Sequence, residues 1–146
     1  MTIDRLPDWT LRMNQALDAA ASRPFVWASW DCCHFVADVV EAMTGQDPLV
    51  EYRETYADEA TAWQVLNDRD GNLRAACRRI FGNCITAPFA KRGDVVLRRG
   101  GMAIGICVGS VAAFTSDTGA GLVFVPMSDC AYAFPLGWPA VEAEPS

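Results

Sequence analysis

The sequence has little positive charge and no long apolar run. Its 146 residues contain 12 Lys and Arg against 18 Asp and Glu, a formal net charge of −6. Phosphate binding needs clustered Lys and Arg, so the composition argues against a nucleic-acid partner. A transmembrane helix needs about 20 consecutive apolar residues, so we expect no membrane span. The opening decapeptide lacks the charged-then-apolar pattern of a signal peptide, which favours a protein that begins in the cytosol.

Histidine is almost missing, and the cysteines lack the spacing of a metal site. His34 is the sole histidine, and no two cysteines form a CxxC pair. A zinc ribbon is therefore disfavoured, and we expect neither a metal nor a cofactor. In a reducing compartment the cysteines are expected to be thiols rather than disulfides. The six are Cys32, Cys33, Cys77, Cys84, Cys107 and Cys130.

The first half of the chain has the periodicity of helices. Apolar residues recur on one face after Pro7, and a second stripe follows Asp31, which is a good N-cap. Gly45 supplies a stop signal for that second helix. The first predicted helix follows Pro7-Asp8 and ends at Arg23-Pro24, and the second starts near Asp31 and closes at Thr44-Gly45. The third and fourth are predicted over about 58–67 and 72–81.

The second half changes to short β-type runs separated by Gly, Ser and Asp. The runs are DVVLRR, MAIGICVG, VAAFT and GLVFVPM. Helices followed by strands predict an α+β domain, in which N-terminal helices pack on a C-terminal antiparallel β-sheet or half-barrel. We expect one domain over residues 1–139 and a disordered tail over residues 140–146.

The segment WDCCHFVADVV, residues 30–40, combines the chemistry of a thiol site with a helix start. With Asp31 as N-cap, Cys32 falls in the first helical turn, where free N–H groups and the helix dipole stabilise a thiolate. The adjacent Asp31 carboxylate opposes this effect. Cys33 follows about 100° further round the helix, so the two thiols are not expected to face one substrate equally.

This segment and the later KRGDVVLRRGGMAIGICVG resemble the NlpC-type branch of the papain-like cysteine peptidases. Those proteins have a cysteine that opens the first core helix, a Gly-Asp-Val turn into a strand, and a following strand with the catalytic histidine. Many of them cleave peptide bonds in peptidoglycan. The resemblance extends from about residue 25 to residue 109, and it implies a papain-like (NlpC-type) fold. It places the nucleophile at Cys32 and the histidine position at Ala103.

A second resemblance covers nearly the whole chain. The sequence is similar to a family of small phage and prophage tail proteins whose shared domain has no assigned function. This resemblance implies a component of a tail tip or of tail assembly, with hub or tail-tip subunits as partners. It implies a location in the host cytoplasm during assembly and then in the virion tail. The matching segments are WDCC, Phe35, Ala37-Asp38, Thr44-Gly45, Asp47-Pro48, Tyr56, RGDVVL, AIGICVG and Gly121-Leu122.

The resemblance to the peptidases does not extend to the general base, because the side chain of Ala103 cannot accept a proton. His34 follows Cys32 by two residues, about 200° round the helix, and is predicted to be a surface or partly buried polar residue. Lys91, or a histidine supplied by a partner protein, remains a formal alternative for the missing general base. The prediction therefore leans towards a pseudoenzyme that assembles into a tail, with contact to peptidoglycan as a further expectation. The alternative is an active cysteine hydrolase that cleaves peptidoglycan peptides during entry.

A thiol cluster is the third alternative. In the peptidase layout the strand face with Ala103 and Cys107 looks towards the Cys32 helix, so Cys33 or Cys32 would approach Cys107. Cys130 would then complete an iron–sulfur or thiolate site, although small buried core cysteines explain the same residues. Three aromatic residues, Tyr52, Tyr56 and Trp63, lie in or after a long loop and are candidates for a protein-binding surface.

Overall fold

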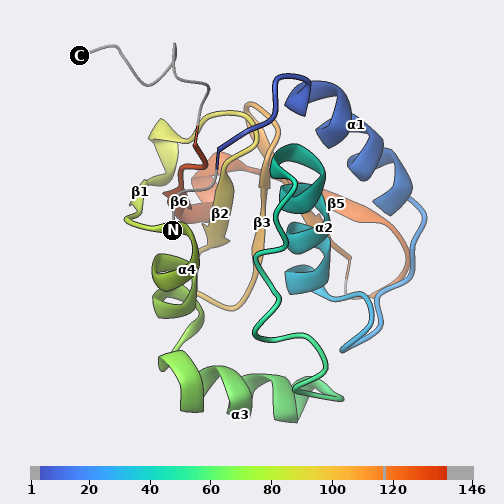
Figure 1. The fold of residues 1–146 in the computed structure, drawn as a ribbon, viewed down its shortest axis with the longest axis vertical. Helices are drawn as coiled ribbons and strands as arrows, with labels where there is room; N and C mark the ends of the chain where they lie inside the picture. Colours follow the sequence, from blue (N-terminus) through green and yellow to red (C-terminus); the bar gives the residue numbers. More distant parts are fainter. Residues whose placement is uncertain (1–3, 117, 138–146) are drawn as a thin grey trace.

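The helices precede the strands along the chain and pack against one side of a sheet, which gives an α+β fold (Figure 1). The computed structural model describes residues 4–116 and 118–137, so the predicted tail at 140–146 lies outside the described residues. In the described ranges no helix is long and apolar enough to cross a membrane. The helices are α1 (Trp9–Ala20), α2 (Cys32–Thr44), α3 (Glu59–Asp70) and α4 (Leu73–Phe81).

Six strands form one antiparallel sheet in the order β1-β6-β2-β3-β4-β5. The four strands predicted from the sequence are present as β2 to β5. The sequence did not predict the short β1 or the last strand β6, which pairs between β1 and β2. The strands are β1 (Ile85–Thr86), β2 (Val95–Arg98), β3 (Ile104–Cys107), β4 (Val111–Thr115), β5 (Leu122–Pro126) and β6 (Cys130–Phe134), with 3₁₀ turns η1 (Ala87–Phe89) and η2 (Met127–Asp129).

The helix boundaries follow from their capping residues. The Asp31 side chain accepts the His34 N–H at the start of α2, and Gly45 ends the helix in a left-handed conformation with φ of 80°. A capping box of Asp58 and Thr61 begins α3, and the Asn72 side chain caps α4. Each of these residues leaves a recognisable signal in the sequence, so helix placement was predicted well.

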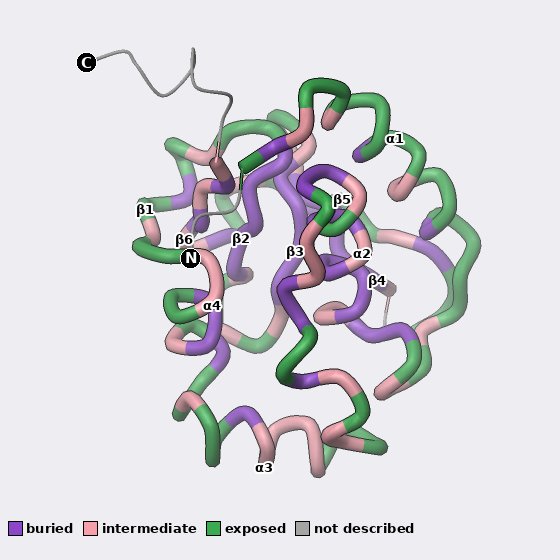
Figure 2. Tube along the Cα trace, in the orientation of Figure 1, coloured by how far each residue is buried: buried purple, intermediate pink, exposed green. Residues whose placement is uncertain are grey.

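Alternate residues of the strands point to opposite faces of the sheet and into two separate apolar clusters. The helix-side cluster joins the four helices to strand residues such as Val95, Ile104 and Ile106. The opposite cluster contains Val96, Cys107 and other strand residues, together with residues next to η1 and η2. Figure 2 shows that α2 and the central strands are the most buried parts of the chain, whereas α3 lies at the surface. Helix α2 packs directly on β3 and β4, and this contact positions the start of α2 over the sheet.

A buried ion pair fixes the N-terminal segment to the turn before β2. The Arg5 guanidinium lies 2.7 Å from Asp94, and both side chains are inaccessible to solvent. Asp94 also accepts backbone N–H groups from Lys91 and Leu136, so it satisfies local donors as its place in the turn predicted. These bonds connect both ends of the described chain to one carboxylate.

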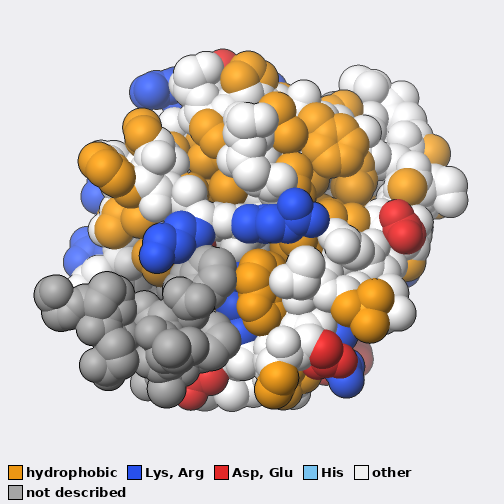
Figure 3. All heavy atoms as spheres, turned by 90° about the horizontal axis from the view of Figure 1, so that it is seen from above, with side chains coloured by type: hydrophobic (Ala, Val, Ile, Leu, Met, Phe, Trp, Pro, Cys, Tyr) orange, Lys and Arg blue, Asp and Glu red, His pale blue; other side chains and the backbone are white. Residues whose placement is uncertain are grey.

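Several large apolar side chains are exposed on the surface. The face in Figure 3 shows hydrophobic side chains in small groups between Lys and Arg side chains. Single exposed apolar side chains are common on folded proteins. The most exposed include Val50, Phe89, Met102 and Phe124.

Candidate active-site pocket

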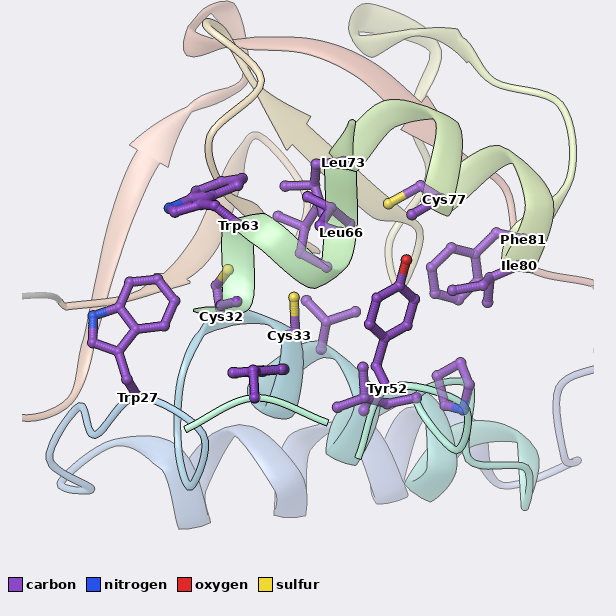
Figure 4. A pocket seen from close by; sticks show the side chains of 18 residues that line it. Trp27, Cys32, Cys33, Tyr52, Trp63, Leu66, Leu73, Cys77, Ile80 and Phe81 are labelled. Atoms are coloured by element: carbon purple, nitrogen blue, oxygen red, sulfur yellow. The ribbon is translucent and has the colours of Figure 1, made fainter. Parts of the chain in front are cut away.

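Cys32 and Cys33 are the first two residues of α2 and line one pocket (Figure 4). The two thiols follow each other by about 100° round the helix, and both nevertheless line this pocket, to which α3 and α4 also contribute residues. Trp27 and Trp63 lie at the Cys32 end of the pocket, and Phe81 lies at the far end. Both thiols are partly accessible to solvent.

The pocket is small and apolar. Its cavity volume is about 70 Å³. Among the described residues that line it, none has an imidazole, carboxylate, amine or guanidinium group. Its polar atoms come from thiols, two tyrosine hydroxyls, two indoles and backbone. The lining residues are Trp27, Cys32, Cys33, Val36, Ala37, Pro48, Leu49, Tyr52, Tyr56, Ala62, Trp63, Leu66, Leu73, Ala76, Cys77, Ile80, Phe81 and Ile104.

The two adjacent thiols have opposite acidities. The hydrogen bond that Cys33 donates lowers the pKa of Cys32, and backbone N–H groups of Ile104 and of Cys32 itself lower it further, although burial acts in the other direction. The same hydrogen bond and burial hold the pKa of Cys33 well above its ordinary value. Cys32 is therefore the more acidic thiol of the pair, and Cys33 is its hydrogen-bond donor.

Asp31 organises the residues beside the thiols. Its carboxylate is 1% exposed and accepts four hydrogen bonds, two of them from backbone N–H groups. The others join it to His34 Nδ1 and to the Tyr56 hydroxyl, each at 2.7 Å. Burial would raise the pKa of Asp31, but the hydrogen bonds from His34 and Tyr56 outweigh it and lower the pKa. Burial, the nearby thiols and Asp31 raise the pKa of Tyr56, which keeps its hydroxyl protonated.

His34 is buried more deeply than the surface or partly buried position that the sequence predicted. It is 7% exposed, and its ring is held by Asp31 and lies edge-on to Tyr56. The sequence argument that helix geometry separates His34 from Cys32 agrees with its place outside the pocket lining. The only histidine of the chain is thus occupied in a structural hydrogen bond.

The residue of β3 that faces Cys32 is Ile104. Its side chain lines the pocket, and its backbone N–H donates to the Cys32 sulfur. Ala103, predicted at the histidine position, packs instead with the cluster on the opposite face of the sheet. Neither side chain can act as a base.

The predicted thiol cluster of Cys33 and Cys107 does not form. Cys107 packs with Cys130 in the cluster on the opposite face of the sheet, whereas Cys33 packs on the helix side. Strand parity explains the error, because Cys107 and the pocket residue Ile104 differ by three positions and point to opposite faces. Across residues 4–116 and 118–137 no group of three acidic, histidine or cysteine side chains could hold a metal ion.

The sequence analysis missed Cys77 as a neighbour of the thiol pair. Cys77 lines the same pocket from α4, and burial raises its pKa, so it remains a thiol. The spacing of Leu73, Ala76, Cys77 and Ile80 marks one face of a helix and was the available signal. Tyr52, predicted as part of a binding surface, is likewise buried against the pocket.

Comparison with known proteins adds a family but no activity. The model of a family described as Domain of unknown function (DUF6950) matches residues 4–136. No curated protein gives a significant match to the chain. The matched residues include the four helices and six strands that the structure describes, and therefore all the residues that line the pocket.

Proposed function

The chain belongs to the DUF6950 family, and we propose that it is a structural or assembly component of a phage or prophage-derived tail, at the tail tip. In this proposal the α+β domain is a papain-like fold of the NlpC type that no longer hydrolyses peptides. It assembles in the host cytoplasm with hub or tail-tip subunits and then remains in the virion tail. The sequence resemblance described above supports the tail assignment.

The observation that supports a non-hydrolytic role is the contact of Cys32 with Ile104. A cysteine peptidase needs a group that protonates the departing amine, and an imidazole usually does this. Ile104 cannot do so, and the described lining has no other ionised acid or base. The sole histidine is held by Asp31 outside the pocket.

The exposed apolar side chains fit a protein that contacts several neighbours. Large apolar residues such as Phe89, Met102 and Phe124 are more than half exposed at 72%, 62% and 57%. Aromatic residues and methionine are enriched at protein interfaces. They supply anchor points on different parts of the surface for tail subunits.

The second candidate is a cysteine hydrolase that acts on peptidoglycan peptides during entry. The lowered pKa of Cys32 at the start of α2 favours it, because a thiolate is the nucleophilic form. This candidate needs a base from a partner subunit.

A Cys32→Ala substitution in the phage or prophage that encodes the chain separates the two candidates. Deletion of the gene should abolish complete tails, and the Cys32→Ala chain should restore them to normal numbers in electron micrographs, with normal infectivity. The matched control is Cys84→Ala, a partly accessible cysteine outside the pocket. Complete particles that bind cells yet fail to cross the cell wall only when Cys32 is replaced would contradict the assembly role and favour the hydrolase.

A further inference from the structure

We propose that Cys32 is a covalent acceptor for short apolar acyl groups, which it takes from acyl thioesters and retains in the pocket. This activity goes beyond tail assembly and rests on the pocket alone. It assigns a use to a nucleophile that has kept its activating contacts but has no base.

The surroundings of Cys32 suit the attack of a sulfur nucleophile on a carbonyl group. Its thiol lies in the first turn of α2 and receives hydrogen bonds from the Cys33 thiol and the Ile104 N–H. N–H groups at a helix start also stabilise negative charge that develops on a carbonyl oxygen. His34 N–H and Phe35 N–H are already bonded to Asp31, and the Cys32 N–H to its own sulfur, which leaves the Cys33 N–H of the first turn for this purpose.

The size and lining of the pocket select the acyl group. A water-sized group needs about 10–15 Å³ of such cavity volume, so the space of about 70 Å³ takes roughly five to seven non-hydrogen atoms. An acyl group of about four to six carbons matches this number. The walls are aliphatic and aromatic, which favours an apolar chain over a charged or hydroxylated one.

A thioester needs less help from the protein than an amide. The Cys32 thiolate attacks the carbonyl carbon, a new C–S bond forms, and the old C–S bond breaks. The departing thiolate takes one proton from solvent, so one thioester replaces another and nothing is oxidised or reduced. Thiols have pKa values of about 8.5, so a thiolate leaves without a general acid, whereas an amine does not.

The acyl group should then persist on Cys32. Hydrolysis of the new thioester would require a water activated by a base beside the carbonyl carbon. The described lining has no such group, and its apolar side chains leave little room for water once the chain is bound. Without a base, Cys32 can accept the acyl group, but the thioester is not hydrolysed.

Intact-protein mass spectrometry tests the proposal with the butyryl thioester of N-acetylcysteamine at neutral pH. We expect one butyryl adduct that peptide mapping places on Cys32, that lasts for hours, and that neutral hydroxylamine removes. Cys32→Ser should abolish this adduct and Cys84→Ser should keep it. The dodecanoyl thioester should react about tenfold or more slowly, because it overfills the pocket.

A pocket-filling variant distinguishes acyl binding from simple thiol reactivity. Ala62 lines the pocket from α3 and is partly exposed, so Ala62→Phe fills space without a deep core change. It should slow butyryl transfer about tenfold and leave alkylation of Cys32 by iodoacetamide nearly unchanged. Equal slowing of both reactions would overturn the proposed acyl selectivity.

The outcomes separate this proposal from tail assembly. If no adduct forms on Cys32, or if Cys84 is labelled as fast, the acyl acceptor is refuted while the assembly role stands. If free butyrate is released over many turnovers, both retention of the acyl group and the non-hydrolytic role are refuted. A stable adduct on Cys32 together with normal tails from the Cys32→Ala chain supports both proposals.

Discussion

Replacement of Asp31 by alanine should destabilise the protein more than replacement of any surface acid. The buried carboxylate accepts from Ala28 N–H at 3.1 Å and from His34 N–H at 3.0 Å, in addition to the His34 ring and the Tyr56 hydroxyl. Alanine removes the N-cap of α2 and leaves two buried side-chain groups without their acceptor. Loss of an N-cap costs about 1 kcal/mol, and removal of one partner from a buried charged hydrogen-bond group costs about 3–5 kcal/mol in total. We expect a loss of about 3–5 kcal/mol.

Urea denaturation followed by circular dichroism measures this loss. Asp31→Asn should cost less than Asp31→Ala, because asparagine is also a good N-cap and keeps an acceptor oxygen. Asp38→Asn is the matched control on the same helix, since Asp38 is 43% exposed and its nearest Arg atoms lie at 3.7 and 3.9 Å. Its cost should stay below about 1 kcal/mol. If Asp31→Ala costs no more than Asp38→Asn, the four-bond network does not exist in solution.

Asp31→Asn should lower the stability of the protein but increase the reactivity of Cys32. The Asp31 charge raises the pKa of Cys32, so Asp31→Asn should lower that pKa and speed alkylation of Cys32 near neutral pH. We therefore expect the Asp31→Asn protein to unfold at a lower urea concentration and its Cys32 to react faster than in the wild type. Slower alkylation in a protein that remains folded would refute the electrostatic part of the reasoning.

Stability should also depend on pH through Asp31. Its folded pKa is lowered, so its contribution is complete above the unfolded value of about 3.9 and is lost as pH falls through the folded pKa. Urea titrations between about pH 5 and pH 2 should show a steeper loss for the wild type than for Asp31→Asn. Parallel curves would mean that the carboxylate gains nothing from its partners on folding.

Three further substitutions test other contacts. Arg5→Met leaves Asp94 buried without its guanidinium and should cost about 3–5 kcal/mol in urea denaturation; a cost below about 1 kcal/mol would contradict a buried pair. Gly105→Ala places a Cβ 2.3 Å from a carbonyl oxygen of β4 and should lower the melting temperature sharply, so an unchanged value would refute this close approach. Cys33→Ala removes the donor to Cys32 and should move the alkylation profile of Cys32 to higher pH; an unmoved profile would rule out the hydrogen bond.

The sequence predicted the helices better than the sheet, and local chemistry explains why. Asp31, Asn72 and Gly45 act on neighbours within a few residues, so their effect is visible in the sequence. Strand β6 has the sequence CAYAF, in which only Tyr132 and Phe134 are of residue types enriched in strands. It exists because β1 and β2 pair with it on either side, and β2 lies more than 30 residues away in the chain. Such long-range pairing has no local signature.

The candidate site was predictable where it depended on helix geometry and not where it depended on strand parity. Cys32 in the first turn of α2 followed from its N-cap. Ala103 packs on the face of the sheet opposite the thiols, because a shift of one residue along a strand moves a side chain to the other face. The same parity places Cys107 away from the thiols. The burial of His34 could not be predicted, because its contact with Tyr56 is brought about by the loop between α2 and α3.

Ile104 accounts both for the lack of a base opposite Cys32 in the described pocket lining and for the apolar wall there. Ile104 donates its N–H to the Cys32 sulfur, as any residue at this place in β3 could, but its side chain also closes the apolar wall opposite the thiol. An imidazole there would need a polar partner, and the nearby carboxylate of Asp31 is already bonded to His34 and Tyr56. The backbone can therefore still stabilise a thiolate while the side chain excludes the water and the base that hydrolysis requires. A pocket with these properties suits a bound or covalently attached apolar group better than turnover of a peptide.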